Sequence, residues 1–199
     1  MIKAVIFDFG GTVRHSYHRG VKNIAKAYQI SEEQLIKVIP QFIESFSKGV
    51  ITEDEFWRQL SRALKKPVPR NRYELWRNEY ERDFFVYPEI ISLVKKIKQK
   101  GFKTAILSNT IKPHLEVNKK YNGYQGFDVL VLSCEVGLRK PERQIYILTA
   151  KKLGVKPKEC VFIDNKEEYL FPAKKLGMKT VLAKSPKWVV KEVSKILGL

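Results

Sequence analysis

Near its N-terminus the chain reads Lys3-Ala4-Val5-Ile6-Phe7-Asp8-Phe9-Gly10-Gly11-Thr12-Val13, an apolar run that ends on a carboxylate and two glycines. Residues 2–7 are long enough for a strand buried on both faces and too short for a typical helix. The glycines let the backbone turn sharply or approach a bound group closely. Ligands of open α/β sheets sit beyond the carboxyl ends of the strands. We therefore expect a central parallel strand that delivers Asp8 into a binding crevice, and capping of the next turn is the alternative role for this residue.

The composition is that of a globular protein. Hydrophobic residues make up 44% of the 199 residues and aromatic residues 12%, which is enough for one sizeable core with a small insert. No apolar run can span a bilayer and no signal-peptide pattern is present, so we expect a cytoplasmic protein with no membrane partner. Cys134 and Cys160 fit no metal or redox spacing, and we expect buried thiols.

The charge is strongly positive. Lysine and arginine total 38 against 21 aspartates and glutamates, a formal net charge of +17. Such a field attracts phosphorylated small molecules and nucleic acids alike. The basic residues come mostly in pairs within helix-like stretches, such as Lys65-Lys66 and Lys151-Lys152. This spread favours solvated helix faces over a nucleic-acid groove. We thus favour a small phosphorylated substrate, with nucleic acid as the lesser alternative and no prediction of oligomeric state.

From residue 21 to residue 85 the hydrophobic period is helical. Apolar residues recur at steps of three and four, Ser31 and Gln34 form a capping-box pattern, and Thr52 precedes a further helix that carries Trp57. No strand pattern interrupts this region. It predicts a small helical insert, whose aromatic stripe is core.

After Pro88, helices alternate with strands. Apolar segments at 104–107, 127–132, 160–163 and 179–183 indicate strands, and helices are expected at 88–100, at 145–153 and ending at Leu176. Strands that alternate with helices pair in parallel through right-handed crossovers. The predicted fold class is α/β, a doubly wound, Rossmann-like parallel sheet with the helical insert after strand 1.

Polar residues follow three of these strands. They are Asp8, the pair Ser108-Asn109 and the pair Asp164-Asn165, while Lys140 lies in a loop before a helix. Strand ends of one parallel sheet meet at one edge, so these groups should converge. A carboxylate nucleophile with hydroxyl and amide donors, a lysine and a second acid suits phosphoryl transfer through an aspartyl intermediate. Lys140, Ser108 and a divalent cation would stabilise the anionic transition state.

With these residues in place, the sequence resembles the haloacid dehalogenase (HAD) superfamily of hydrolases along nearly its whole length. The four segments that carry the likeness, in chain order, are Phe7-Asp8-Phe9-Gly10-Gly11-Thr12-Val13, Ile106-Leu107-Ser108-Asn109, Gly137-Leu138-Arg139-Lys140-Pro141-Glu142, and Cys160-Val161-Phe162-Ile163-Asp164-Asn165 with Ala173-Lys174-Lys175-Leu176-Gly177-Met178. Each is weak alone, but four in order are specific. The likeness implies an α/β hydrolase core at 1–13 and 88–199 and a helical cap domain at 14–87, hinged near Arg14 and residues 85–88.

The resemblance also implies roles for single residues. Asp8 would be the nucleophile and a magnesium ligand, with Thr12 supporting its loop. Ser108 and Asn109 would hold the phosphoryl oxygens, and Lys140 would neutralise the nucleophile and the transferred group. The remaining expected residues are Gly10, Asp164 and Asn165 at the Mg²⁺, and Gly11, Arg14 and His15 at the substrate.

Three positions depart from the family's phosphatases. Gly10 stands where a second Asp usually protonates the leaving group, and loss of such an acid typically costs about 10²- to 10⁴-fold in rate. Asn165 and Tyr169 stand where acidic or amide ligands are common. The site has thereby lost negative charge, and we expect weakened Mg²⁺ affinity.

Three function classes are consistent with this pattern. The first, which we favour, is a metal-dependent phosphatase of modest rate, with His15 as one candidate proton donor and a hinge histidine as its alternative role. The second is a metal-independent 2-haloacid dehalogenase, which also lacks the second Asp but usually has an aromatic residue at the position of Gly10. The third is a catalytically degenerate binding or regulatory protein. Retention of Asp8, Ser108, Lys140 and Asp164 favours an enzyme. His18 and His114 are expected at the surface.

Overall fold

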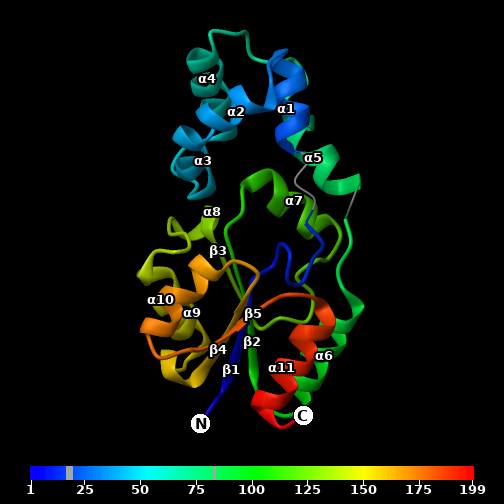
Figure 1. Cartoon of the computed structure of the whole chain (residues 1–199), viewed down its shortest axis with the longest axis vertical. Helices are drawn as coiled ribbons and strands as arrows, with labels where there is room; N and C mark the ends of the chain where they lie inside the picture. Colours follow the sequence, from blue (N-terminus) through cyan, green and yellow to red (C-terminus); the bar gives the residue numbers. More distant parts are fainter. Residues whose placement is uncertain (17–19, 83) are drawn as a thin grey trace.

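The computed structural model describes residues 1–16, 20–82 and 84–199, and its centre is a five-stranded parallel sheet (Figure 1). The strand order is β3-β2-β1-β4-β5. The strands are β1 (Ala4–Phe7), β2 (Lys103–Ser108), β3 (Val129–Leu132), β4 (Cys160–Asp164) and β5 (Lys179–Leu182). Phe7 lies in register with Ile106 of β2 and Ile163 of β4, so the chain leaves β1 at Asp8 beside Asp164. The predicted α/β fold class is confirmed.

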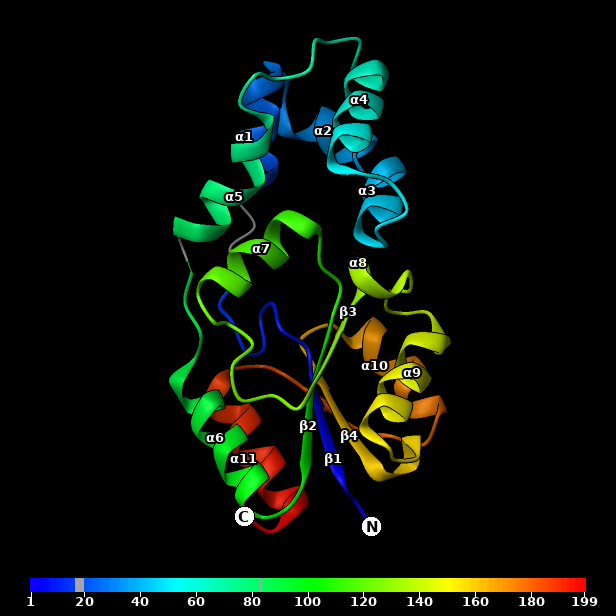
Figure 2. The ribbon, with the colours of Figure 1, turned by 180° about the vertical axis from the view of Figure 1, so that it is seen from behind.

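Helices cover both faces of the sheet (Figures 1 and 2). Val5 and Phe7 pack in one apolar cluster with α6 (Pro88–Gln99) and α11 (Pro186–Leu197). Ala4 and Ile6 pack in another with α9 (Arg143–Leu153) and α10 (Glu167–Lys175). Successive side chains of a strand point to opposite faces. This alternation explains why every residue of β1 is apolar.

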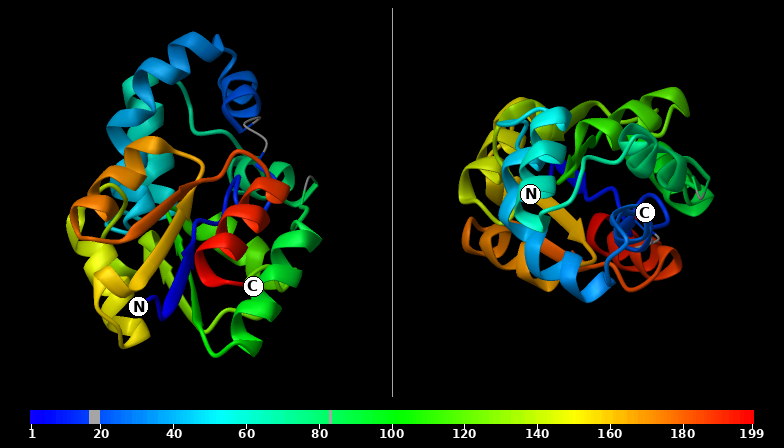
Figure 3. Two further views of the ribbon diagram at one scale, coloured as in Figure 1. Left: turned by 60° about the horizontal axis from the view of Figure 1, so that its bottom comes forward. Right: turned by 90° about the horizontal axis from the view of Figure 1, so that it is seen from above.

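Within the described residues, five helices that follow β1 form a lobe with its own apolar cluster, above the carboxyl ends of the strands (Figure 3). They are α1 (Gly20–Tyr28), α2 (Glu32–Val38), α3 (Pro40–Ser47), α4 (Glu53–Leu64) and α5 (Arg72–Arg82). Ser31 and Gln34 make the expected capping box, and Thr52 caps α4. Trp57 is fully buried and Trp76 nearly so, as predicted for the aromatic stripe, but Tyr73 near the start of α5 is 41% exposed and lies outside the core.

Two linkers that run side by side join this lobe to the sheet. The amide N–H of Tyr87 donates to the Val13 carbonyl at 2.9 Å, and that of His15 donates to the Phe85 carbonyl at 2.8 Å. Arg14 and Val86 form an antiparallel bridge between these bonds. The expected hinge residues thus form a short two-stranded ribbon.

Some expectations differ from the structure. The first strand begins at Ala4 rather than at residue 2, because Ile2 lies before the ladder with β2 and β4. Sequence reasoning missed α7 (Lys112–Lys120), α8 (Ser133–Val136), the 3₁₀ turn η1 (Pro157–Glu159) and α11. His114, expected at the surface, is half-buried in α7, while His18 lies outside the described residues. None of the described helices is long and apolar enough to cross a membrane.

Candidate active site

Lys140 joins two carboxylates at the edge of the sheet. Its Nζ donates to Asp8 Oδ1 and to Asp164 Oδ2, both at 2.6 Å. Asp8 follows β1, Asp164 ends β4, and Lys140 comes from the loop before α9. Lys140 and Asp164 are each 1% exposed and Asp8 is 6% exposed. The structure therefore brings together three groups that are far apart in sequence, as the strand-end argument predicted.

Burial and charge act in opposite directions on this cluster. Burial raises the pKa of Asp8 to about 6, although the ammonium of Lys140 lowers it. Burial also opposes the charge on Lys140, but attraction by Asp8 and Asp164 outweighs it and its pKa is raised. At neutral pH the site thus holds an ionised Asp8 and a protonated lysine. Asp8 Oδ2 is buried and has no hydrogen-bond partner in the described part of the chain.

The loop after β1 is held by its own backbone. The Phe9 carbonyl accepts from the N–H groups of Val13 and Arg14, and Gly11 donates to the Arg14 carbonyl at 2.7 Å. Gly11 has φ +88°, a conformation that favours glycine. Thr12 is 2% exposed, and no described residue bonds its buried Oγ1. The loop is thereby fixed next to Asp8 by backbone hydrogen bonds, and the supporting role expected of Thr12 stays a prediction.

Asn109 differs from the expectation that it holds phosphoryl oxygens. Its Nδ2 donates to the Lys140 carbonyl and its Oδ1 accepts from the Lys140 amide N–H, both at 2.8 Å. Both ends of the side-chain amide therefore fix the loop that carries Lys140. We correct its assignment to a positioning residue. Ser108, the last residue of β2, is 4% exposed and remains the candidate hydrogen-bond donor to the phosphoryl oxygens.

Gly10 lies in the loop after β1, and Asn165 directly follows Asp164 at the end of β4 and is exposed. Of the atoms in residues 1–16, 20–82 and 84–199, a Cβ built on Gly10 would meet only Ser16 Oγ, at 4.0 Å, so none of these residues crowds the position. The amide of Asn165 packs on Gly11, where an added Cβ would be 2.4 Å from Asn165 Nδ2. Gly11 therefore allows the fourth motif to approach the first. Tyr169 turns its ring toward Lys140, with Nζ 5.0 Å from the ring centroid.

Arg14 and His15 occupy the linker rather than an open pocket. The Arg14 guanidinium is buried, donates to the carbonyls of His15 and Tyr80 at 2.8 Å, and lies 3.7 Å from the Tyr80 ring centroid. His15 Nδ1 is 2.7 Å from the Tyr87 hydroxyl. We correct Arg14 from a substrate contact to a residue that holds the linker to α5. His15 remains a candidate proton donor, which would act from its place in the linker.

Sequence reasoning missed the stack that extends from Arg14. The rings of Tyr80 and His114 are stacked at 4.0 Å, and Trp76 meets His114 edge to face at 5.7 Å. Burial raises the pKa of Tyr80, and the charge of Asp8 adds to the shift while Arg14 opposes it. The helical period of Trp76 and Tyr80 placed them on one face of α5, but nothing in the sequence linked that face to α7.

The comparison with protein families agrees with this geometry. The sequence model of the haloacid dehalogenase-like hydrolases matches residues 2–177, which includes all of the site residues described above. The chain belongs to this hydrolase family.

Curated relatives of this HAD hydrolase differ in length. Acyl-CoA dehydrogenase family member 10 of Mus musculus is 30% identical over 98% of this chain, which spans only 19% of that protein. The glyceraldehyde 3-phosphate phosphatase of Methanopyrus kandleri is 27% identical over 94% of this chain and 86% of its own length. Among solved structures, a HAD family enzyme from Bacteroides thetaiotaomicron in complex with magnesium and inorganic phosphate is 26% identical, with a TM-score of 0.74. The match covers 92% of this chain and 95% of that one.

The donor set of this HAD hydrolase fits Mg²⁺. Mg²⁺ prefers oxygen ligands and is usually held by one or two carboxylates together with waters and substrate phosphate. Asp8 and Asp164 supply two buried carboxylates, and Asp8 Oδ2 has no bonding partner within the described residues. No cluster of three His, Cys, Asp or Glu side chains suited to a metal occurs within 1–16, 20–82 and 84–199. The remaining ligands would be the Gly10 carbonyl, the Asn165 amide oxygen and water.

Proposed function

We propose that this protein is a Mg²⁺-dependent phosphatase that hydrolyses a small phosphorylated metabolite through an aspartyl phosphate at Asp8. The observation that carries the proposal is the buried Asp8–Lys140–Asp164 cluster, in which one oxygen of Asp8 is left without a hydrogen-bond partner among the described residues. A carboxylate desolvated in this way is a stronger nucleophile than one in water. The lobe of α1–α5 would act as the cap over the substrate, with residues 14–87 as its extent.

In the first step Asp8 Oδ2 attacks phosphorus, the bond from phosphorus to the leaving oxygen breaks, and the leaving group departs as an oxyanion that takes its proton from water. In the second step water attacks the same phosphorus, the bond to Asp8 breaks, and inorganic phosphate leaves. Lys140 keeps its proton throughout, because its pKa is raised, and neutralises charge on Asp8 and on the phosphoryl oxygens. Ser108 donates to a phosphoryl oxygen, and Asn109 holds the Lys140 loop in place.

Asp8, Asp164 and the Gly10 carbonyl would hold the Mg²⁺, with Asn165 as a neutral fourth ligand. When bound, the ion polarises and neutralises the phosphoryl group. Because Asn165 carries no charge, the affinity for Mg²⁺ would be weaker than with a third carboxylate. Gly10 provides no proton for the leaving group, so substrates with leaving groups of low basicity would react fastest.

The relatives support the choice of a phosphorylated metabolite. The Methanopyrus protein is named for action on glyceraldehyde 3-phosphate, and the Bacteroides enzyme binds magnesium and phosphate. The second buried carboxylate, Asp164, also favours a cation site over the metal-independent displacement of a halide.

The test is hydrolysis of an aryl phosphate by the purified protein, with Mg²⁺ and with chelator, beside Asp8→Asn. We expect turnover that needs Mg²⁺ and is lost in Asp8→Asn, because an aryl leaving group needs little protonation. Absence of turnover in the wild-type protein would count against the proposal. Halide release from a 2-haloacid would then identify a dehalogenase, and failure of both assays would favour a binding protein.

A further inference from the structure

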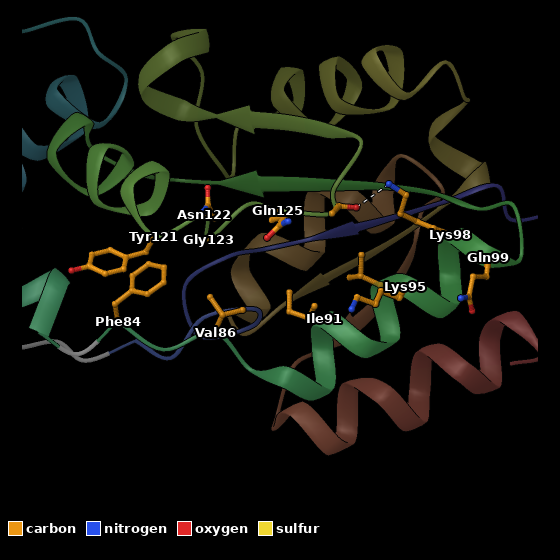
Figure 4. A pocket seen from close by; sticks show the side chains of 12 residues that line it. Phe84, Val86, Ile91, Lys95, Lys98, Gln99, Tyr121, Asn122, Gly123 and Gln125 are labelled. Atoms are coloured by element: carbon orange, nitrogen blue, oxygen red, sulfur yellow. Dashed lines mark hydrogen bonds between the residues drawn. The ribbon is translucent and has the colours of Figure 1, made fainter.

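Figure 4 shows a groove of about 640 Å³ and the side chains that line it. Its walls are α6, the turn at 121–126 that follows α7, and the second linker at Phe84 and Val86. Asp8, Ser108, Lys140 and Asp164 do not line it. Pockets of this size commonly hold a small organic molecule.

The floor of the groove is apolar. Phe84 and Val86 of the linker and Ile91 and Val94 of α6 line it, and Figure 4 shows Val86 and Ile91 next to each other. Phe84 stacks on Tyr121, with ring centroids 5.0 Å apart. Apolar surface left open to water favours an apolar ligand by about 25 cal/mol for each Å² that is covered.

One cation stands at the rim without a counter-charge in the described part of the chain. Lys95 of α6 is exposed and has no ion-pair partner there, whereas Lys98 is tied to Asp128 at 2.7 Å and to the Gly126 carbonyl at 3.0 Å. Among the described residues that line the groove there is no carboxylate. An anionic group at Lys95 would thus be attracted and not repelled.

One wall of the groove is held in place by the core. A Cβ on Gly123 would lie 2.9 Å from Phe84 Cζ and 3.2 Å from Phe9 Cζ, so both Phe84 and Phe9 pack against the turn at Gly123. Val86 forms the antiparallel bridge to Arg14. The floor is therefore preformed by ordered backbone, which lowers the entropic cost of binding.

We infer that this groove is a second binding site, for an amphipathic anion whose apolar body covers Phe84, Val86 and Ile91 and whose single carboxylate or sulfonate pairs with Lys95. The inference does not depend on the proposed phosphatase activity. An uncharged molecule of the same shape would lack the pairing with Lys95. A purely inorganic anion would lack the apolar contact with the floor of the groove.

The probe is 1-anilinonaphthalene-8-sulfonate, followed by its fluorescence in a titration of the whole protein. We expect saturable binding that Lys95→Glu weakens at least tenfold and that Ile91→Trp, which fills the groove, abolishes. Lys96→Glu is the matched control, because it makes the same charge change on α6 outside the groove. It should leave the affinity within twofold of wild type. Circular dichroism verifies that each variant is folded.

Competition distinguishes this groove from the catalytic site. Decanoate should displace the dye at a concentration at least tenfold lower than decanol does, and inorganic phosphate with Mg²⁺ should not displace it. Displacement by phosphate would place the dye at the catalytic cluster and overturn the inference. Equal weakening by Lys95→Glu and Lys96→Glu, or no effect of Lys95→Glu, would overturn it as well.

Discussion

Gly10 is the residue at which the catalytic site can be changed most directly. Its backbone is outside the region of positive φ, and among the described residues only Ser16 Oγ lies within 4.0 Å of an added Cβ. The described surroundings therefore leave room for the Cβ of an Asp. We predict that Gly10→Asp raises the rate of alkyl phosphate hydrolysis by about tenfold or more, because general acids contribute roughly 10²–10⁴-fold. Aryl phosphate hydrolysis should change much less.

Steady-state kinetics with one alkyl and one aryl phosphate measure this difference. Gly10→Asn is the control, since it has the same shape and no proton to give. An equal gain in both variants would show that volume and not proton transfer is the cause.

Asn165 is the uncharged side chain in the proposed metal site. Its amide already lies against Gly11, and a carboxylate has nearly the same shape. We predict that Asn165→Asp tightens Mg²⁺ binding by about tenfold, as ligand charge tunes affinity at such sites. Titration calorimetry measures both proteins. Micromolar affinity in the wild type would contradict the expected weakening, and an unchanged affinity in the variant would place Asn165 outside the ligand set.

Among the elements, α3 touches the sheet domain at the loop that carries Lys140. Lys48, just after α3, pairs with Glu142 at 2.6 Å and with Glu44 at 3.1 Å. Beside it, Ser133 Oγ donates to the Ser47 carbonyl at 2.6 Å. Such partly exposed ion pairs contribute up to about 1 kcal/mol to stability. We therefore expect their main effect to be on the order of the loop that carries Lys140, and not on the stability of the whole protein.

We predict that Lys48→Ala speeds hydrogen exchange at residues 139–142 while the thermal midpoint stays nearly unchanged. Lys37→Ala is the control, because Lys37 pairs at 2.6 Å with Glu33 within the lobe. Exchange measured by mass spectrometry compares the two. The same exchange at 139–142 in both variants would mean that α3 does not hold the Lys140 loop.

Element by element, the sequence predicted most of what positions the site. Apolar runs with β-branched residues located the strands, and the strand ends brought Asp8 and Asp164 to Lys140. The helix α7 was missed because its apolar residues Leu115 and Val117 are two positions apart, which is not a helical spacing, although Pro113 in its first turn is a common helix start. The pairing of Asn109 with the Lys140 backbone could not be predicted either. A side-chain amide that follows a strand can hydrogen-bond to a bound ligand as well as to the backbone of a neighbouring loop.

Across the whole molecule, pH acts on stability in two opposite ways. Burial lowers the pKa of His114 to about 3 from 6.5, with Arg14 and Arg77 adding to the shift. The unfolded chain therefore gains protons below pH 6.5 that the folded chain does not. Stability from this residue is full above pH 6.5 and falls as the pH drops toward 3. Asp8 acts oppositely, since its raised pKa favours the folded state below 3.8 and loses that contribution as the pH rises through 6.

We predict that His114→Phe, which keeps a ring against Tyr80, reduces the loss of stability between pH 7.5 and pH 5 by on the order of 1–2 kcal/mol. Urea unfolding at the two pH values measures it. Parallel pH curves for wild type and His114→Phe would show that the histidine does not titrate on unfolding.

Asp8→Asn should stabilise the protein most near pH 7.5, where the buried carboxylate is charged.

The central place of β1 has a consequence for synthesis of the chain. Ala4 pairs with Lys103 on one side and with Cys160 on the other, so the strand made first has no neighbour until much later. At about 5–20 residues per second, a ribosome needs roughly ten to thirty seconds to make the segment between β1 and the end of β4. The lobe of α1–α5 is contiguous and rich in local contacts, and we expect it to fold in that interval. The nascent chain would then carry a folded helical bundle next to the apolar strand β1, which is not yet paired with β2 and β4.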